Sequence, residues 1–374
     1  MALPIPAPRP DPAERWPNGP RREVSLVVQT SFLGDVVLTT PLIAELAQRG
    51  AVDVVVRPDG AALLANNPDV RRVIVFDKRG THAGAGGVWR MGGVLRRLAR
   101  EDGDARRVAY LAQGSVRSAT LAMLGGFAER VGFETSRSAR PLYTRVVRYR
   151  ADRHHAERLW SLAMPDDAQP APEALRPRLH PGYEERRAVS ALLSGFATGD
   201  PIVALAPGSV WATKRWPYYA ELAARLAATG AQLVVVGGPG DAELARAIVA
   251  AAPAALDATG KLSLLASAEL IGRCATLVTN DSAPQHLASA MGVPTVTIFG
   301  PTVPEFGFGP LAPGSRTAGH PGLACRPCDA HGPQRCPLGH WRCMRELTPE
   351  TIAQVVGAVT ADHATRHAPR HVAR

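Results

Sequence analysis

Short runs of β-branched and other apolar residues alternate with stretches of helical periodicity along most of the chain. In the first half, this pattern predicts strands at 24–29, 52–57, 73–76 and 108–111 and a helix at 36–48. In the second half, it predicts strands at 202–206, 232–236, 277–279 and 295–299 and helices at 217–229, 241–251 and 283–291. Buried strands separated by helices indicate parallel sheets covered on both faces. We therefore expect an α/β protein with two doubly wound, Rossmann-like domains facing a cleft.

The periodicity weakens between about 150 and 200, where prolines accumulate, as is typical of a passage between domains. The predicted parts are a disordered Pro-rich tail at 1–20, an N-terminal domain at 21–180, a C-terminal domain at 181–360 and a basic tail at 361–374. A Gly-rich stretch at 82–93 interrupts the first block, and it predicts a mobile loop.

The composition, with 46% hydrophobic and 20% charged residues, is that of a globular protein with a sizeable core. No run of about 18 uncharged apolar residues could span a membrane, and residues 1–20 lack the apolar core of a signal peptide. We therefore expect a cytoplasmic protein. The net charge of +10 leaves a nucleic-acid-binding protein open, although no helix-turn-helix or finger spacing supports one.

Ligands of doubly wound sheets bind beyond the carboxyl ends of the strands, so the strand-to-helix turns are the places to look for chemistry. The first such turn follows the strand that ends at Gln29, and it places Asp35 at a helix N-terminus. A carboxylate at that position either caps the helix or acts on a ligand. The turn lacks the G-x-G-x-x-G of dinucleotide folds, which argues against a nicotinamide cofactor.

The second turn, at 207–217, combines backbone N–H groups with Ser209, Thr213 and Lys214, and it predicts a phosphate site. Only three of the 43 basic residues are lysines, so the presence of one here points to a role for a compact ammonium group. The alternative is a solvated surface lysine.

The third turn opens the helix predicted at 283–291, with Asp281 or Ser282 as the N-cap and His286 one turn further on. A helix N-terminus with an adjacent hydroxyl and imidazole can bind an anion, although a lone histidine on a helix is also a common structural residue. Because the third turn and the Lys214 turn belong to one predicted domain, together they favour a phosphate site.

Four segments together resemble the ADP-heptose:lipopolysaccharide heptosyltransferases, and the similarity is greatest to the heptosyltransferase II group. They are SFLGDVVLTTPL at 31–42, PGSVWATKRWP at 207–217, NDSAPQHLASAMGVPTVTIFGPT at 280–302 and CRPCDAHGPQRCPLGHWRCM at 325–344. The resemblance implies a GT-B fold, in which the N-terminal domain binds the acceptor and the C-terminal domain binds the nucleotide sugar.

Carried over by position, the resemblance implies that Asp35 is the general base that takes a proton from the acceptor hydroxyl. It implies that the phosphates and sugar of the nucleotide sugar are held by Ser209, Thr213, Lys214, Asp281, Ser282, Ala283 and His286. The adenosine side would lie near Gly237, Gly238 and Asp241. Many family members have glycine in place of Ala283 and methionine in place of Gln285, so a different nucleotide sugar stays an alternative.

Four of the five cysteines crowd together as Cys325-x2-Cys328-x7-Cys336-x6-Cys343. In a cytosolic protein such a cluster suggests a structural zinc site, but the second pair lacks the tight spacing of a zinc ribbon, so reduced thiols that pack a loop are the other interpretation. Heptosyltransferase II relatives carry a similar segment, whose role the resemblance does not give. The fifth, Cys274, precedes a strand, and we expect it to be a buried apolar residue.

The activity implied by the resemblance is inverting transfer of L-glycero-D-manno-heptose from ADP-heptose to the heptosyl-Kdo2-lipid A inner core of lipopolysaccharide, with no cofactor needed for catalysis. A related GT-B glycosyltransferase with another sugar or acceptor, a basic nucleic-acid-binding protein and a non-catalytic nucleotide sensor are the alternatives. Residues 90–153 hold 14 arginines and six acidic residues, a local net charge of +8. We expect this charge to meet the anionic acceptor and to bring the protein to the surface of the inner membrane.

Overall fold

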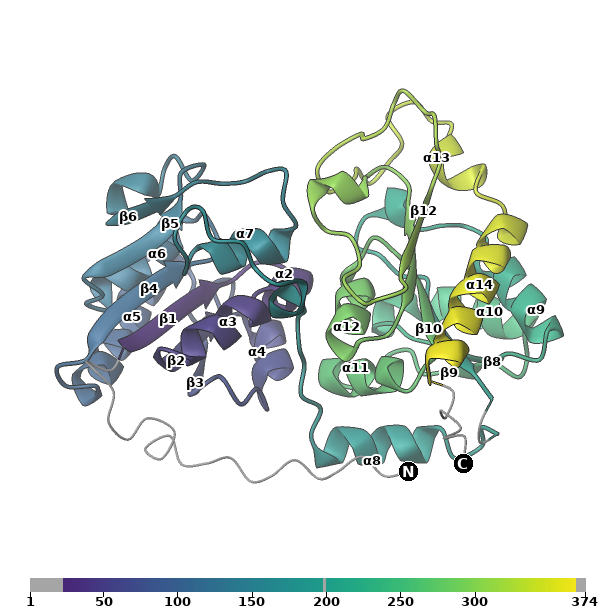
Figure 1. Ribbon diagram of the computed structural model, residues 1–374, viewed down its shortest axis with the longest axis horizontal. Helices are drawn as coiled ribbons and strands as arrows, with labels where there is room; N and C mark the ends of the chain where they lie inside the picture. The colour runs from purple at the N-terminus through teal and green to yellow at the C-terminus, as the bar shows by residue number, and fades with distance from the viewer. Residues whose placement is uncertain (1–22, 198–199, 368–374) are drawn as a thin grey trace, which may run out of the picture. The chain divides into compact units, whose positions relative to one another are not determined.

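The computed structural model describes residues 23–197 and 200–367, which divide into two compact units. The first unit holds the described residues up to Arg150 together with Ala156–Ala171, and the second holds Ala151–His155 and the described residues from Pro172 onward (Figure 1). The chain thus passes between the units near 150, 155 and 171, whereas the sequence placed a single boundary at 180. The predicted tail at 1–20 lies outside the described residues.

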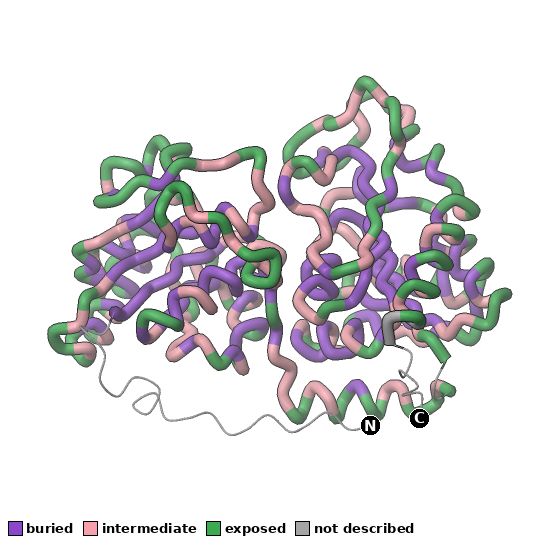
Figure 2. Tube along the Cα trace, in the orientation of Figure 1, coloured by how far each residue is buried: buried purple, intermediate pink, exposed green. Residues whose placement is uncertain are grey.

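The first unit is built on a six-stranded parallel sheet with the order β3-β2-β1-β4-β5-β6. Its strands are β1 (Glu23–Gln29), β2 (Gly50–Val56), β3 (Arg72–Val75), β4 (Arg106–Leu111), β5 (Glu129–Phe133) and β6 (Arg145–Val147). The four predicted strands are confirmed, and β5 and β6 are additional. Every residue of β1 is buried, as expected for a central strand covered on both faces (Figure 2).

The helices of this unit are α2 (Leu33–Leu38), α3 (Thr40–Ala47), α4 (Pro58–Leu64), α5 (Gly84–Glu101), α6 (Val116–Leu124) and α7 (His155–Ser161), with a 3-10 turn η1 (Arg140–Leu142). The single helix predicted at 36–48 is two helices, since Thr39 both ends α2 and precedes α3, in whose first turn Pro41 lies. Proline is favoured in the first turn of a helix and excluded from its interior, so the chain restarts there.

The mobile loop predicted at 82–93 is wrong, because these residues from Gly84 onward form the start of the 18-residue helix α5. Its buried face carries Gly87, Met91, Gly92, Leu95 and Ala99, which follow a helical spacing. A Cβ built on Gly92 would lie 2.6 Å from the Cβ of Leu124 on α6. The glycine therefore allows close packing of two helices rather than loop mobility.

The second unit repeats the topology of the first, with a parallel sheet in the order β12-β11-β10-β7-β8-β9. Its strands are β7 (Ile202–Ala206), β8 (Gln232–Val235), β9 (Leu256–Asp257), β10 (Thr276–Asn280), β11 (Thr295–Phe299) and β12 (Arg316–Gly319). In each sheet the chain order reverses between two neighbouring central strands, β1 and β4 or β7 and β10. Turns that leave such a pair lie side by side, and ligands bind there.

The helices of the second unit are α8 (Tyr183–Leu192), α9 (Tyr219–Ala228), α10 (Ala242–Ala251), α11 (Leu264–Gly272), α12 (Ala283–Met291), α13 (Arg342–Arg345) and α14 (Pro349–His367), with 3-10 turns η2 (Pro172–Leu175), η3 (Ala212–Lys214), η4 (Pro239–Asp241) and η5 (Pro304–Phe306). The predicted strands and the helix at 283–291 are confirmed. The first residues of the predicted basic tail at 361–374 form the end of α14, which runs to His367, and the remainder lies outside the described residues.

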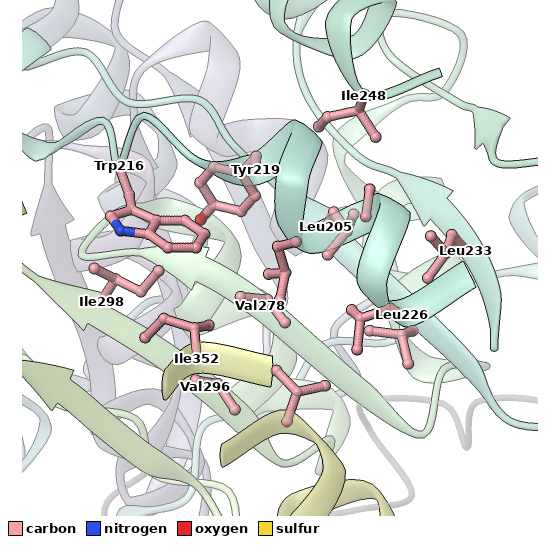
Figure 3. Packing of buried hydrophobic residues seen from close by; sticks show 14 of the residues in the cluster. Leu205, Trp216, Tyr219, Leu226, Leu233, Ile248, Val278, Val296, Ile298 and Ile352 are labelled. Atoms are coloured by element: carbon pink, nitrogen blue, oxygen red, sulfur yellow. The ribbon is translucent and has the colours of Figure 1, made fainter. Parts of the chain in front are cut away.

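One hydrophobic cluster joins the sheet of the second unit to α9 and α14. Figure 3 shows Trp216 and Tyr219 beside Val278 of β10 and Ile298 of β11. The rings of Trp216 and Tyr219 meet edge to face with centroids 5.3 Å apart, and the Trp216 indole nitrogen donates to the Leu347 carbonyl. These contacts fix Trp216, the last residue of the 207–216 turn.

Among the described residues, no helix combines the length and the apolar character that crossing a membrane requires.

Candidate functional site

The turns after β7 and β10 meet at the point where the second sheet reverses its order, and they bring Lys214 and Asp281 together. The Lys214 ammonium lies 2.6 Å from Asp281 Oδ2, and the hydroxyl of Thr302 donates to the same oxygen at 2.6 Å. All three side chains are buried. A buried charge without a partner is costly, so the ammonium and the carboxylate hold each other in place. The predicted convergence of the two turns is thus found, and Lys214 is not a solvated surface lysine.

Helix α12 begins directly beside this ion pair. Ser282 is its N-cap residue in an extended conformation, and its side chain makes no capping hydrogen bond. The Ser282 hydroxyl instead lies 3.3 Å from the Thr279 hydroxyl. The second residue of α12, Pro284, has no N–H, and the N–H of Gln285 donates to the Ser282 carbonyl at 3.2 Å. The donor that the helix start offers to an anionic group is therefore the N–H of the half-buried Ala283.

His286 lies on the same helix and is buried. The Nε2 atoms of His286 and Gln285 are 3.4 Å apart, and Gln285 donates from its amide to the carbonyl of Phe308 at 2.5 Å. The imidazole is thus held against the 306–309 turn, one turn of helix from Ser282. These contacts do not involve a sugar, so the role of His286 in sugar binding stays a prediction.

The 207–216 turn is held by a residue that the sequence analysis did not select. Asn280 is buried, and its side chain donates to the carbonyl of Pro207 at 2.8 Å and accepts from the backbone N–H of Trp216 at 3.1 Å. One amide thus fixes both ends of the turn that carries Lys214. Asn280 precedes Asp281 in the sequence, but its two contacts, 64 and 73 residues away, arise only in the folded chain.

Ser209 and Thr213 contribute differently from each other. Ser209 is half-buried, and its hydroxyl accepts from the N–H of Trp211 at 3.3 Å, so it remains at the surface of the turn. Thr213 is buried, and its hydroxyl donates to the carbonyl of Pro333. The structure therefore gives the Thr213 side chain a contact within the protein, and this differs from the predicted contact with the diphosphate.

The residues predicted on the adenosine side lie next to the same turn. The Asp241 carboxylate accepts from the N–H of Gly238 at 2.9 Å and closes the short turn η4. A Cβ built on Gly208 would lie 2.3 Å from Asp241 Oδ1, and one on Gly237 would lie 2.8 Å from Oδ2. Glycine is thus required where the turns after β7 and β8 approach each other.

In the first unit, Asp35 occupies the N-terminal turn of α2. Its carboxylate accepts from the N–H of Phe32 at 3.2 Å, and its carbonyl accepts from the hydroxyl of Thr39 at 2.6 Å. The capping interpretation of Asp35 is confirmed, and since the side chain is only half-buried, the cap does not conflict with a role as a base.

A group of basic residues surrounds the same end of the first sheet. Lys78 donates to the carbonyl of Thr30 at 2.7 Å, and the Thr30 hydroxyl donates to the side chain of Gln113 at 2.6 Å. Burial, followed by the charges of Arg57, Arg117 and Arg79, lowers the pKa of Lys78. We call these four cations the basic group.

The arginines of 90–153 contribute less to this surface than their number predicts. Arg106 pairs with Glu23 and Glu129, and Arg130 donates to the carbonyls of Phe127 and Leu142. These two arginines therefore have partners within the first unit. Three of the four members of the basic group lie outside the 90–153 stretch.

The cysteines are all free thiols. Cys343 is buried in the core of the second unit, and burial raises its pKa to about 11. Cys325, Cys328 and Cys336 are partly buried, yet among the described residues no group of three or more His, Cys, Asp or Glu side chains is arranged to hold a metal ion. Cys274 is buried as expected, and its pKa is raised to about 12.

The thiol interpretation of the cysteines therefore stays our prediction. Metal analysis of the purified protein is expected to find below about 0.2 equivalents of zinc, against about one per chain for a structural ion. A stoichiometric zinc content that resists dialysis would establish the alternative.

Two Rossmann-like units with a candidate phosphate site in the second are the architecture of GT-B glycosyltransferases. The model of glycosyltransferase family 9 (heptosyltransferase) matches residues 95–337, and the chain therefore belongs to that family. It is 30% identical to lipopolysaccharide heptosyltransferase 1 of Pseudomonas aeruginosa, over 75% of this chain and 79% of that protein. It is 29% identical to lipopolysaccharide heptosyltransferase 2 of Salmonella typhimurium, over 75% of this chain and 84% of that protein.

Solved structures share the fold. The Escherichia coli ADP-heptose lipopolysaccharide heptosyltransferase II is 24% identical with a TM-score of 0.72, covering 90% of this chain and 98% of that chain. The E. coli heptosyltransferase WaaC, solved with ADP-2-deoxy-2-fluoro heptose, is 21% identical with a TM-score of 0.61, covering 89% of this chain and 99% of that chain. The predicted family, fold class and enzyme class are confirmed, and neither the nucleic-acid-binding nor the sensor alternative gains support.

Proposed function

We propose that this heptosyltransferase moves L-glycero-D-manno-heptose from ADP-heptose to heptosyl-Kdo2-lipid A, with inversion at the anomeric carbon. The observation that carries the proposal is the Lys214–Asp281–Thr302 group beside the uncapped start of α12. An ammonium and the backbone N–H of Ala283 at a helix N-terminus suit a diphosphate. The heptosyltransferase structure solved with an ADP-heptose analogue supports the choice of nucleotide sugar.

The reaction breaks the bond between the anomeric carbon and the diphosphate and forms a bond from that carbon to the acceptor oxygen. Negative charge grows on the departing ADP, and Lys214 with the N–H of Ala283 at the start of α12 stabilises it. A preorganised group of this kind contributes about 10²–10³-fold. Asp35 takes the proton of the acceptor hydroxyl, and a positioned base contributes about 10²–10⁴-fold. No step requires a cofactor.

The basic group supports an anionic acceptor. Arg57, Lys78, Arg79 and Arg117 follow strands β2, β3 and β4, at the same sheet edge as the turn that carries Asp35. The carboxylates of Kdo and the phosphates of lipid A have the complementary charge. Each basic residue near an anionic lipid surface contributes about 1 kcal/mol, which would also hold the protein at the inner membrane.

The two similar relatives are named heptosyltransferase 1 and heptosyltransferase 2 and are almost equally identical to this chain, so the acceptor needs a direct test. The test measures ADP release with ADP-heptose, ADP-glucose or a UDP-sugar, each with Kdo2-lipid A or heptosyl-Kdo2-lipid A. We expect turnover with ADP-heptose and the heptosylated acceptor. Turnover with Kdo2-lipid A alone would replace the proposal with a heptosyltransferase I activity. Preference for another nucleotide sugar would replace the proposed donor and would point to Ala283.

A further inference from the structure

The segment that contains the four cysteines, Cys325–Cys343, lies against the turn that carries Lys214. Within it, the side-chain oxygen of Gln334 accepts from the N–H of Ala212 at 3.1 Å, and its amide nitrogen donates to the carbonyl of Val210 at 3.0 Å. The rings of His331 and Trp211 are stacked, with an interplanar angle of 10° and centroids 6.1 Å apart. With the bond from Thr213 to Pro333, three consecutive parts of the turn are therefore held from this one segment.

Gly332 of the same segment approaches Lys214 directly. Its φ of +80° is in the left-handed region that favours glycine. A Cβ added there would lie 3.0 Å from Pro301 Cγ, 3.3 Å from the Thr213 hydroxyl and 3.4 Å from Lys214 Cε. The backbone at 332 thus packs against the aliphatic part of the Lys214 side chain.

The beginning of the segment holds the other side of the ion pair. Arg326 donates to the carbonyls of Phe299, Gly300 and Thr302 at 2.9, 2.5 and 3.0 Å and also to that of His320. The N–H of Cys328 donates to the carbonyl of Pro301 at 2.8 Å. These bonds fix the turn after β11, and the Thr302 hydroxyl of that turn donates to Asp281.

We infer that Cys325–Cys343 is a positioning element for the nucleotide-sugar site, and that Gln334 is its positioning residue for the Lys214 turn. Through Gln334 the segment fixes the turn that carries Lys214, and through Arg326 it fixes the turn after β11, whose Thr302 hydroxyl donates to Asp281. The inference rests on the proposed function, because it assigns the effect to the site that binds ADP-heptose.

Gln334 is the residue to test, because it is exposed and its truncation removes no core packing. Gln334→Ala removes both hydrogen bonds, whereas Gln334→Glu keeps the acceptor for the N–H of Ala212 and loses the donor to Val210. Arg335→Ala is the matched control, since Arg335 is the exposed neighbour and has no hydrogen bond to the 207–216 turn in the described structure.

For Gln334→Ala, we expect the KM for ADP-heptose and the Kd for ADP by calorimetry to rise about tenfold, a size suited to the loss of two hydrogen bonds. Gln334→Glu should give an intermediate value. The KM for the acceptor and the Tm should stay at the wild-type value, and Arg335→Ala should match the wild type throughout.

Unchanged KM and Kd in Gln334→Ala would overturn the inference, as would a fall in kcat alone, which indicates a smaller active fraction. If the wild type itself turns over no ADP-heptose with either lipid acceptor, the proposed function fails. The ADP titration still tests the positioning role in that case, because it needs no turnover.

Discussion

The two sheets have the same strand order, but the turns at their reversal points are built differently. In the second unit, the turns after β7 and β10 meet in a buried ion pair that also has a hydroxyl partner. In the first unit, the turn after β1 presents a half-buried capping carboxylate, and the basic group at the same sheet edge is partly or fully exposed. The shared topology therefore supplies only the location of each site. The site in the second unit is buried, and the site in the first unit is partly open to solvent.

Asp35→Asn is the substitution that separates the two sites most sharply. Asparagine keeps an oxygen for the N–H of Phe32 but is not a base, so we expect kcat to fall about 10²–10⁴-fold. ADP binding by calorimetry should be unchanged, because the diphosphate contacts belong to the other unit. The control is Glu185→Gln, which neutralises the equivalent capping residue of α8, bonded to the N–H of Gly182 at 2.7 Å. Near-normal turnover in Asp35→Asn would remove Asp35 from the mechanism.

Lys214→Ala tests the buried site of the second unit. We expect transfer to slow about 10²–10³-fold and nucleotide-sugar binding to weaken, because the diphosphate loses its cation. The free energy of unfolding should also fall by about 3–5 kcal/mol, because Asp281 is left as an unpaired buried charge.

The double variant Lys214→Met with Asp281→Leu separates the effect of the ion pair on stability from its effect on turnover. Urea unfolding should show most of the stability restored, since two apolar side chains of similar volume replace the pair. Its turnover should remain as low as that of Lys214→Ala. A stable double variant with normal kinetics would contradict the diphosphate assignment.

Thr302→Val removes one hydrogen bond to Asp281 while preserving the shape of the side chain. Hydrogen bonds to charged groups contribute about 1.5–3 kcal/mol, so we expect urea unfolding to show a loss of that order and the KM for ADP-heptose to rise. Thr317→Val in the edge strand β12 is a control of the same type at an exposed position. Equal effects of the two substitutions would show that the Asp281 contact has no special role.

Lys78→Ala should have the smallest effect, because it removes one of four cations and the half-buried Lys78 is still partly screened by solvent. We expect the KM for the acceptor to rise about fivefold, which corresponds to about 1 kcal/mol at an anionic lipid, with the KM for ADP-heptose unchanged. Lys261→Ala in the second unit, an exposed lysine that donates to the carbonyl of Asp257, is the control for loss of a positive charge. A rise in the ADP-heptose KM instead would assign the basic group to the other substrate.

Periodicity predicted the parallel sheets and the strands from which the site is built, because buried strands carry continuous apolar runs. It also placed Lys214 and Asp281 in neighbouring turns, since ligand sites of such sheets lie at the carboxyl ends. Asn280, Thr302 and Gln334 were not predicted as site residues. Each acts through partners at least 20 residues away, and a local sequence pattern does not predict such contacts.

The Gly-rich stretch shows a different limit of sequence reasoning. Glycine is permissive in turns, so residues 82–93 suggested a loop. Gly92 is instead a contact point, because α6 brings Leu124 to a distance at which only glycine fits. The reason for this residue lies in another helix, 32 positions further along the printed sequence.

The neutrality of the Lys214–Asp281 pair has a consequence for the response to ionic strength. Two opposite charges 2.6 Å apart in a buried site attract few counter-ions, so added salt has little to screen there. The exposed cations around Lys78 lie in solvent, where the Debye length falls from about 10 Å at 0.1 M to 3 Å at 1 M salt. If the proposed sites are correct, we expect added salt to raise the KM for an anionic lipid acceptor more than the KM for ADP-heptose.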